Sequence, residues 1–402
     1  MNLLQEGIQT HAVEKTEMTR KLTLDGVTKA YPVYRVHLDS LYYNDQNDRI
    51  ATYISRYKSE HGGAAPDVSD REGYNALIEQ FIIDSNPDAI RKTRTNIEMV
   101  GQREPGVVLS DGRVIDGNRR FTCLRQLSRK KDGFNYFETV ILDRSIEHNM
   151  KQIKLLELSI QHGEEARVDY DPVDRLVGVY NDLIDTRLLT VPEYARSTNE
   201  TEAEVRRRME DAQLMVEFLE FINAPKQFHI ARDLQVVNPL HELPTMLRKC
   251  SGPDEEEMLK NAVFTNLLLK PSGDMTRFVR KIKGILSSPF KQEFLDEQMS
   301  IAERAVDLLP PVGKVNSDVI REQVRSYTDL TEALDRSMEK ADLKSKKDAT
   351  RNRPVQLVEK ATSFLEDIDP HILLKLNDSE LQRFVRQLDL LDGVIAQLRE
   401  NL

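Results

Sequence analysis

Apolar residues change their spacing within a short stretch near the middle of the N-terminal half. Aliphatic, mostly β-branched runs at 107–109 and 114–115 are typical of strands. Between them, Asp111-Gly112 predicts a tight hairpin, because both residues tolerate the positive φ angles that such a turn needs. From residue 118 to 127, apolar residues recur at helical spacing. The pattern therefore predicts strand, turn and strand, followed directly by a helix that begins beside Gly117.

Shorter patterns on either side predict the rest of an N-terminal α+β domain spanning residues 31–148. Alternating residues predict a strand at 34–41, and a β-rich run predicts another at 137–142. Helical spacing predicts three helices between these strands, at 50–61, 74–84 and 88–100. Residues 1–30 are polar and weakly patterned, so we expect a tail or a loosely attached strand there.

Residues 149–223 are predicted to be helical, and two helix starts in this stretch are clearly marked. Thr190 is followed three residues later by Glu193, and Thr201 is followed in the same way by Glu204. This is the spacing of a capping box, in which two side chains satisfy each other's backbone amides at the start of a helix. A short helix, a polar turn and a longer helix follow one another, which is typical of helix-turn-helix segments.

The second of these helices, predicted at 203–221, would be the recognition helix of such a segment. Its basic residues Arg206, Arg207 and Arg208 could then contact the phosphates or base edges of duplex DNA. The alternative is an ordinary helical hairpin with a solvated arginine cluster. Acidic residues surround the arginines and would weaken a DNA-binding face.

From residue 224 onward the pattern is helical, with a predicted domain at 224–339. One helix of this domain carries basic residues opposite its apolar ones: Arg277, Arg280, Lys281 and Lys283. A solvated face explains them, and a second place for nucleic acid is the alternative.

The end of the chain is predicted to be a charged linker, or alternatively an exposed helix end, at 340–354 and an apolar helical hairpin at 355–402. The second helix of this hairpin carries an apolar stripe from Leu381 to Leu398. Because such a hairpin cannot bury its apolar residues alone, we expect a homodimer, or docking on the preceding helices.

Composition narrows the possible classes of protein. The chain has 402 residues, enough for several domains, with 39% hydrophobic and 31% charged residues. Its two cysteines form neither a disulfide framework nor a metal-binding spacing. No apolar run is long enough for a membrane span, so we expect a cytoplasmic protein. The net charge of −10 means that any contact with DNA must come from a local basic element.

The residues around Gly117 carry the clearest candidate chemistry. Backbone amides at the start of a helix lack partners within the helix, and the helix dipole adds partial positive charge, so this position suits an anion. Arg119 and Arg120 add planar charged groups that match phosphate oxygens. In the alternative interpretation Asp116 caps the helix, Gly117 relieves a tight junction and the arginines are solvated.

The stretch from Pro105-Gly106 through the hairpin to Gly117-Asn118-Arg119-Arg120 resembles the N-terminal domain of the ParB and sulfiredoxin superfamily, and the resemblance extends over about residues 31–215. It implies an α+β ParB-like domain, followed by a KorB-like helix-turn-helix and further, mostly α-helical domains. In this superfamily the matching element holds nucleotide phosphates. Where sulfiredoxins have their catalytic cysteine, this chain has Asn118, so sulfiredoxin activity is not expected.

The resemblance also implies a set of site residues. Gly117, Asn118, Arg119 and Arg120 would bind the phosphates of CTP or ATP, with Asp116, Arg49 and His162 also in the cofactor-binding site. Partition-type ParB proteins carry an acidic-Asn pair before the next helix, and this pair is not reproduced here. The candidates in its place are His162, Arg167 and the pair Glu164 and Glu165, which would hold Mg²⁺ and act in catalysis. The arginines are expected at the surface.

We therefore expect a nucleoid-associated, ParB-like nucleotide-binding protein that acts on duplex DNA. Within this expectation, it would be an ATP- or CTP-hydrolysing component of a partition, DNA-modification or phage-defence system, with protein partners from that system. A helix-turn-helix adaptor or regulator without catalysis is the alternative. A metal-dependent nuclease, with Asp116 and Glu104 as metal ligands, is the third possibility. No Walker, zincin, CxxC or GxSxG motif suggests another chemistry.

Overall fold

The computed structural model describes residues 2–24, 27–143, 146–163, 171–271 and 274–402. The chain divides into two compact units. The first contains Met1–Lys283 and Glu293–Met338, and the second contains Gly284–Gln292 and Glu339–Leu402. None of the helices in the described part of the chain is long and apolar enough to cross a membrane.

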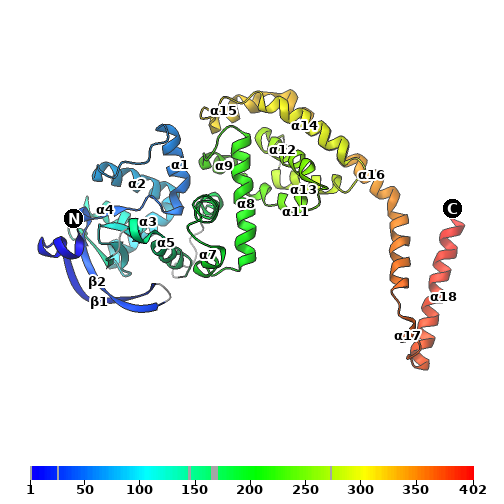
Figure 1. Ribbon diagram of the computed structural model, residues 1–402, viewed down its shortest axis with the longest axis horizontal. Helices are drawn as coiled ribbons and strands as arrows, with labels where there is room; N and C mark the ends of the chain where they lie inside the picture. Colours follow the sequence, from blue (N-terminus) through cyan, green and yellow to red (C-terminus); the bar gives the residue numbers. More distant parts are fainter. Residues whose placement is uncertain (1, 25–26, 144–145, 164–170, 272–273) are drawn as a thin grey trace. The chain divides into compact units, whose positions relative to one another are not determined.

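A mixed sheet forms the N-terminal part of the first unit (Figure 1). Within the described residues it has six strands in the order β1-β2-β6-β4-β5-β3. The strands are β1 (Val13–Leu24), β2 (Val27–His37), β3 (Tyr42–Tyr43), β4 (Gly106–Leu109), β5 (Arg113–Asp116) and β6 (Tyr136–Leu142). The pairs β3–β5 and β4–β6 are parallel, and the other neighbours are antiparallel.

Alternate side chains along the strands fill a separate hydrophobic core on each face of the sheet. Val108 and Val114 face a core shared with four helices: α1 (Ala51–Glu60), α2 (Arg71–Ser85), α3 (Pro87–Val100) and α4 (Asn118–Ser128). Val107 and Ile115 face the opposite core, which is covered by α5 (Ile146–Gly163). The three helices predicted at 50–61, 74–84 and 88–100 and the strand predicted at 137–142 are thus confirmed, and so is the α+β class of this part. The strand predicted at 34–41 is confirmed only as far as His37, because Leu38–Ser40 form a short 3₁₀ helix.

The predicted tail at 1–30 is wrong, because this stretch is part of the sheet. Residues Leu3–Gly7 form a helical turn, η1, and β1 follows, pairing with β2 over most of its length. Since β1 is an edge strand, only a few of its residues face the core, among them Val13 and Leu22. The remaining positions are polar and exposed, which explains the weak pattern.

The rest of the first unit is helical. Short helical turns lie between the larger elements. The turns η2 (Leu38–Ser40) and η3 (Asp48–Ile50) precede α1, and η4 (Tyr180–Asp185) follows the first of the helices given below. The helices are α6 (Pro172–Val179), α7 (Val191–Thr198), α8 (Glu202–Phe221), α9 (Phe228–Leu234), α10 (Val237–Leu240), α11 (Leu243–Leu247), α12 (Pro253–Leu269), α13 (Met275–Ile285), α14 (Lys291–Val306) and α15 (Ser317–Glu322), with the turn η5 (Val324–Ser326). This agrees with the predicted mostly helical second half.

The charged stretch 340–354 lies within a single long helix, α16 (Thr328–Glu366), so its prediction as a linker is wrong and the alternative of an exposed helix holds. Charged residues such as Lys and Glu are good helix formers, and pairs such as Lys346 with Asp342 stabilise an exposed helix locally. After α16 follow α17 (Pro370–Leu373) and α18 (Asp378–Glu400). Large apolar side chains on α16 and α18 remain exposed, including Val358, Phe364, Leu388 and Leu398.

Candidate functional site

The junction between β5 and α4 places a helix start against an open space. Gly117 has φ 92° and ψ 18°, in the left-handed region, and α4 begins at the next residue without a side-chain cap. A Cβ atom on Gly117 would lie 2.8 Å from Cζ of Phe137, so no larger residue fits without a shift. The backbone amides of the first turn are therefore left to interact with a ligand or solvent.

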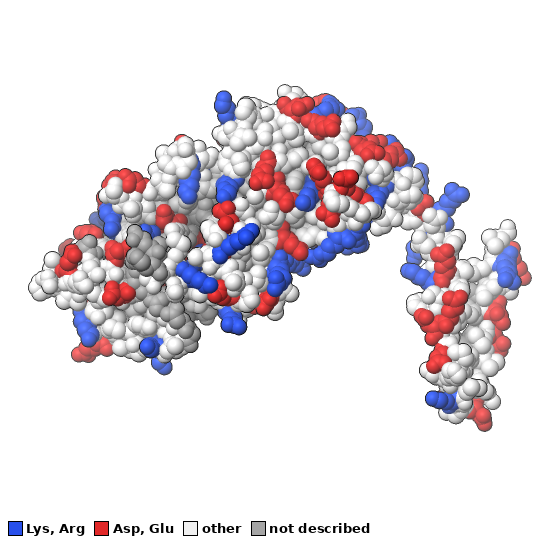
Figure 2. Space-filling view, in the orientation of Figure 1, with Lys and Arg blue, Asp and Glu red and all other residues white. Residues whose placement is uncertain are grey.

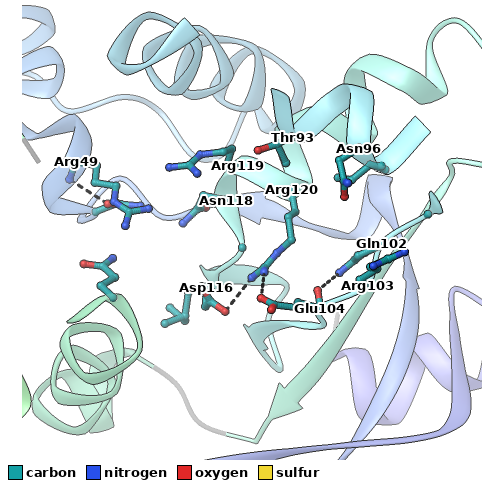
Figure 3. A pocket seen from close by; sticks show the side chains of 16 residues that line it. Arg49, Thr93, Asn96, Gln102, Arg103, Glu104, Asp116, Asn118, Arg119 and Arg120 are labelled. Carbon is teal, nitrogen blue, oxygen red and sulfur yellow. Dashed lines mark hydrogen bonds and ion pairs between the residues drawn. The ribbon is translucent and has the colours of Figure 1, made fainter. Parts of the chain in front are cut away.

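These amides face a cavity of about 290 Å³. Its walls come from the start of α4, from the side of α3, from the segment 101–104 and from η3, which lie far apart in the sequence (Figure 3). Four arginines line it: Arg49, Arg103, Arg119 and Arg120. Such a concentration of permanent positive charge beside a helix N-terminus suits a polyanion.

The two arginines of the motif point in different directions (Figure 3). Arg119 extends towards the side of the cavity where Arg49 lies, and both also line a smaller adjoining cavity of about 50 Å³. Arg120 extends to the opposite side, where its guanidinium donates to Glu104 and to Asp116, both at 3.1 Å. Its side chain is only 14% exposed, so the expectation that both arginines lie at the surface is wrong for Arg120.

Asp116 anchors this side of the site. Besides Arg120, its Oδ2 atom accepts a hydrogen bond from Arg20 of β1 at 2.9 Å, and Arg20 also donates to the carbonyl oxygen of Pro105. Asp116 does not cap α4, because no side chain does so. The carboxylate therefore serves to hold two arginines and to fix the β5–α4 junction.

Two of the buried polar atoms at the cavity that have no hydrogen-bond partner among the described residues belong to the motif itself. They are Oδ1 of Asn118 and Nε of Arg120. Both residues line the cavity, and a buried polar atom without a partner costs free energy comparable to a lost hydrogen bond. Asn118 therefore offers an acceptor, and Arg120 a further donor, to whatever enters this space.

The structure brings most of the predicted cofactor-binding residues together. It does not test the roles predicted for the acidic residues. Asp116, Gly117, Asn118, Arg119, Arg120 and Arg49 all line the cavity. His162 lies in the last turn of α5, next to Gln161 in the cavity wall, and the structure does not describe its side chain. Glu164, Glu165 and Arg167 lie outside the described residues, so their metal-binding and catalytic roles stay predictions.

Metal chemistry has little support in the part of the chain that the structure describes. No group of three or more His, Cys, Asp or Glu side chains there could hold a metal ion. Glu104 and Asp116, the pair considered for a nuclease, both accept hydrogen bonds from Arg120. Both carboxylates are therefore engaged by the same guanidinium.

One wall of the cavity is tied to the helical segment by buried charges. Asp48, which lies between the cavity-lining residues Asn47 and Arg49, accepts a hydrogen bond from Nζ of Lys154 at 2.8 Å. Burial alone would lower the pKa of Lys154, but the carboxylates of Asp48, Glu157 and Asp182 raise it well above its usual value. Lys154 is therefore a cation held between the N-terminal sheet domain and the helices that follow.

A second link joins α1 to α6 and α9. The backbone amide of Thr52 donates to Asp174 at 2.9 Å, while Arg232 donates to the hydroxyl of Thr52 and pairs with Asp171 at 3.0 Å. Burial raises the pKa of the Asp174 carboxyl to about 7. Asp171 caps α6 by accepting a hydrogen bond from the backbone amide of Val173, and Pro172 is the first residue of the helix.

Both predicted capping boxes are present in the helix pair α7 and α8. The amide of Thr190 donates to Glu193 at 2.9 Å, and that of Thr201 donates to Glu204 at 2.8 Å. Asn199 has φ 55° and ends α7, so the chain turns sharply before α8 begins. The two helices and the turn between them thus have the form that the sequence predicts.

The three arginines on α8 differ in their surroundings. Arg208 donates to both oxygens of Glu200, which also pairs with Arg175 of α6, so Arg208 holds the turn in place. Arg206 is exposed and pairs with Glu202 one turn earlier, at 2.8 Å. Arg207 is exposed as well. A role in DNA binding therefore fits Arg206 and Arg207 better than Arg208.

Sequence reasoning missed part of the cavity wall. Thr93 and Asn96 on α3, together with Gln102 and Arg103 after it, face the same space as Gly117. Gly101, with φ 75°, ends α3 and turns the chain along the cavity. The sequence offered one indication of this wall, because the segment lies directly before the hairpin that leads to Gly117. Its side chains form no recognisable motif.

No protein-family model matches the sequence, and no curated protein matches it. Among solved structures, one match is to a Pnob8-like ParB-N domain, with 13% sequence identity and a TM-score of 0.29, covering 76% of this chain and 97% of that chain. Identity and TM-score are too low for this match to carry an argument about function. The α+β class of the N-terminal part and the helical class of the remainder follow from the strands and helices described above.

Proposed function

We propose that the chain is a ParB-like protein that binds a nucleoside triphosphate, CTP or ATP, in the cavity at the start of α4. The observation that carries the proposal is the uncapped helix N-terminus at Gly117, which opens into a space lined by four arginines. Phosphate oxygens would accept hydrogen bonds from the amides of the first turn and from Arg119. The resemblance of the Gly117–Arg120 motif to the ParB superfamily supports the same assignment.

Mg²⁺ is part of this proposal, because proteins usually bind nucleoside triphosphates together with Mg²⁺, which coordinates the phosphate oxygens. Oxygen ligands for Mg²⁺ would come from the phosphates and from carboxylates such as Glu164 or Glu165. Hydrolysis of the nucleotide would need an ordered water near the same carboxylates. The proposal is therefore of a nucleotide-binding switch that can also act as an NTPase.

The nucleotide site would act on DNA through the helix pair α7 and α8, with Arg206 and Arg207 directed at the duplex. The exposed apolar side chains of α16 and α18 support a homodimer formed through the C-terminal hairpin. Such an arrangement suits a component of a DNA partition, DNA-modification or phage-defence system, working with protein partners from that system.

Isothermal titration calorimetry of the full chain tests the nucleotide site directly. CTP, ATP and GTP are titrated separately, with and without Mg²⁺ and with and without duplex DNA. We expect saturable binding of CTP or ATP that is tighter with Mg²⁺. Absence of binding for all three nucleotides under all of these conditions contradicts the proposal.

A second candidate is a DNA-binding adaptor that binds no nucleotide. One observation favours it: the two terminal nitrogens of Arg120, a central residue of the motif, already donate to Glu104 and Asp116. In that case the motif would only stabilise the β5–α4 junction. DNA binding by the full chain, unchanged by any nucleotide in the titrations above, would identify the adaptor.

A further inference from the structure

Helix α13 presents a face that is entirely basic. Its sequence, Met275 to Ile285, contains no acidic residue. The apolar residues Phe278, Val279 and Ile282 are buried, and the cations between them are exposed: Arg277, Arg280, Lys281 and Lys283. Arg248 and Lys249, which follow α11, are exposed too. We call these six residues the α13 face.

The α13 face stands out because the chain as a whole is acidic, with a net charge of −10. Two of its six cations, Arg280 and Arg248, pair with carboxylates. Glu242 accepts hydrogen bonds from Arg280 at 2.6 and 2.9 Å, and Glu210 accepts one from Arg248 at 2.6 Å. Figure 2 shows Lys and Arg side chains gathered along the edge of the molecule below α11 and α13. The face is therefore a local cationic surface.

A chain of contacts connects the α13 face to α8. Arg248 pairs with Glu210 of α8, and Asp211, the next residue, lies 2.5 Å from Nδ1 of His241. His241 is followed by Glu242, the partner of Arg280. Arg207 lies one helical turn before Asp211, so its side chain projects from α8 on the side that carries these contacts. The basic residues of α8 and of α13 thus border one continuous surface.

We infer that the α13 face binds the phosphate backbone of duplex DNA beside the segment contacted by α8. This inference rests on the proposed function, in which α7 and α8 form the helix-turn-helix. An 11-residue helix is about 16 Å long, and duplex DNA carries one charge per about 1.7 Å of its axis, so several phosphates lie within reach of one such face. An exposed row of cations without a specific pocket suits the phosphate backbone, which has no sequence-specific shape.

The test compares duplex DNA binding by the full chain and three variants, measured by fluorescence anisotropy over a range of salt concentrations. The first variant is R277Q/R280Q/K281Q, which removes three charges from the α13 face. The second is R207Q on α8. The third is a control that removes three charges from exposed lysines on the β1–β2 hairpin, K15Q/K21Q/K29Q.

We expect the α13 variant to lower the slope of log affinity against log salt by about 2–3, because each lost phosphate contact removes about 0.9. Its affinity for DNA should fall by about tenfold or more at moderate salt. The control, with the same change in net charge, should keep the slope of the parent chain. Circular dichroism and thermal unfolding of each variant report whether it is folded, and R277Q/K281Q, which spares the pair between Arg280 and Glu242, replaces the triple variant if that one unfolds.

Three outcomes overturn the inference, and they are distinguishable. If the parent binds DNA and the α13 variant keeps its affinity and slope while R207Q loses affinity, the α13 face is not a DNA contact and the proposed DNA function stands. If the α13 variant and the lysine control lose affinity equally, net charge alone is responsible. If the parent binds no duplex but binds polyglutamate through the α13 face, the surface serves an acidic protein, and the DNA function falls as well.

Discussion

The adjacent residues Arg119 and Arg120 are expected to have separable roles, and replacing each by Ala tests this. Arg119 points towards the side of the cavity where Arg49 lies, and with Asn118 it also lines the smaller adjoining cavity. In the proposed site it contacts a phosphate, and a charge-assisted hydrogen bond contributes about 1.5–3 kcal/mol. Arg119→Ala should therefore weaken nucleotide binding about tenfold to a hundredfold.

Arg120→Ala should chiefly affect the stability of the ligand-free chain. The variant loses two hydrogen bonds at 3.1 Å, but their costs differ. Glu104 is 79% exposed, so its pair contributes little, whereas Asp116 is buried and keeps its bond to Arg20. We expect a loss of about 1 kcal/mol and a fall of a few degrees in Tm.

The assays are calorimetric titration with CTP or ATP and Mg²⁺, and thermal unfolding without ligand. Arg91→Ala is a matched control, because Arg91 lies on α3, is 67% exposed and does not line the cavity. It should leave both measurements unchanged. The reasoning is refuted if Arg119→Ala binds nucleotide as the parent chain does, or if Arg120→Ala loses more affinity than Arg119→Ala.

Two further predictions concern the buried carboxylate of Asp174 and the C-terminal hairpin. Burial raises the pKa of Asp174 to about 7, so the folded chain keeps a proton that the unfolded chain releases near pH 4. Between these two pH values the free energy of unfolding should therefore decline as the pH rises. The decline should be about 1.4 kcal/mol per pKa unit. Asp174→Asn has no such proton, and chemical denaturation at a series of pH values should show a flatter dependence for it than for the parent; an equally steep one contradicts the assignment. Leu388 is an exposed apolar residue of α18, so Leu388→Glu should weaken self-association in sedimentation velocity, while Gln382→Glu on the same helix should not. A parent chain that is monomeric at high concentration rules out the dimer.

The elements that could be predicted from the sequence have complete local signals. The hairpin around Asp111-Gly112 forms between β4 and β5 as predicted, but of its two central residues only Gly112 has a positive φ, 93°. The starts of α7 and α8 are specified by two side chains three residues apart, and both capping boxes form. The start of α4 is marked by Gly117 itself and by the change from strand spacing to helical spacing after it. Such features depend on neighbours along the chain, so a single sequence suffices to find them.

Other features depend on contacts that the sequence does not display. β1 is held by pairing with β2 and by a few core residues, so its own pattern is weak. The cavity wall formed by Thr93 and Asn96 meets Gly117 only because α3 packs on α4. Arg208 reaches Glu200 because the chain turns at Asn199 and brings the two together. From the sequence, Arg208 therefore looks as accessible to DNA as its neighbours, whereas in the structure its guanidinium is paired with a carboxylate.

The buried pair of Asp48 and Lys154 has a mechanical consequence for the cavity. Removing one partner of a buried ion pair costs about 3–5 kcal/mol, so the pair resists separation when the turn η3 moves. Asn47 and Arg49 stand on either side of Asp48 and both line the cavity. Any displacement of this wall by a ligand must therefore carry α5 along with it. The turn η3 and the helix α5 are therefore coupled through this buried ion pair. By linkage, a contact that holds α5 in place also holds the wall of the cavity that η3 forms.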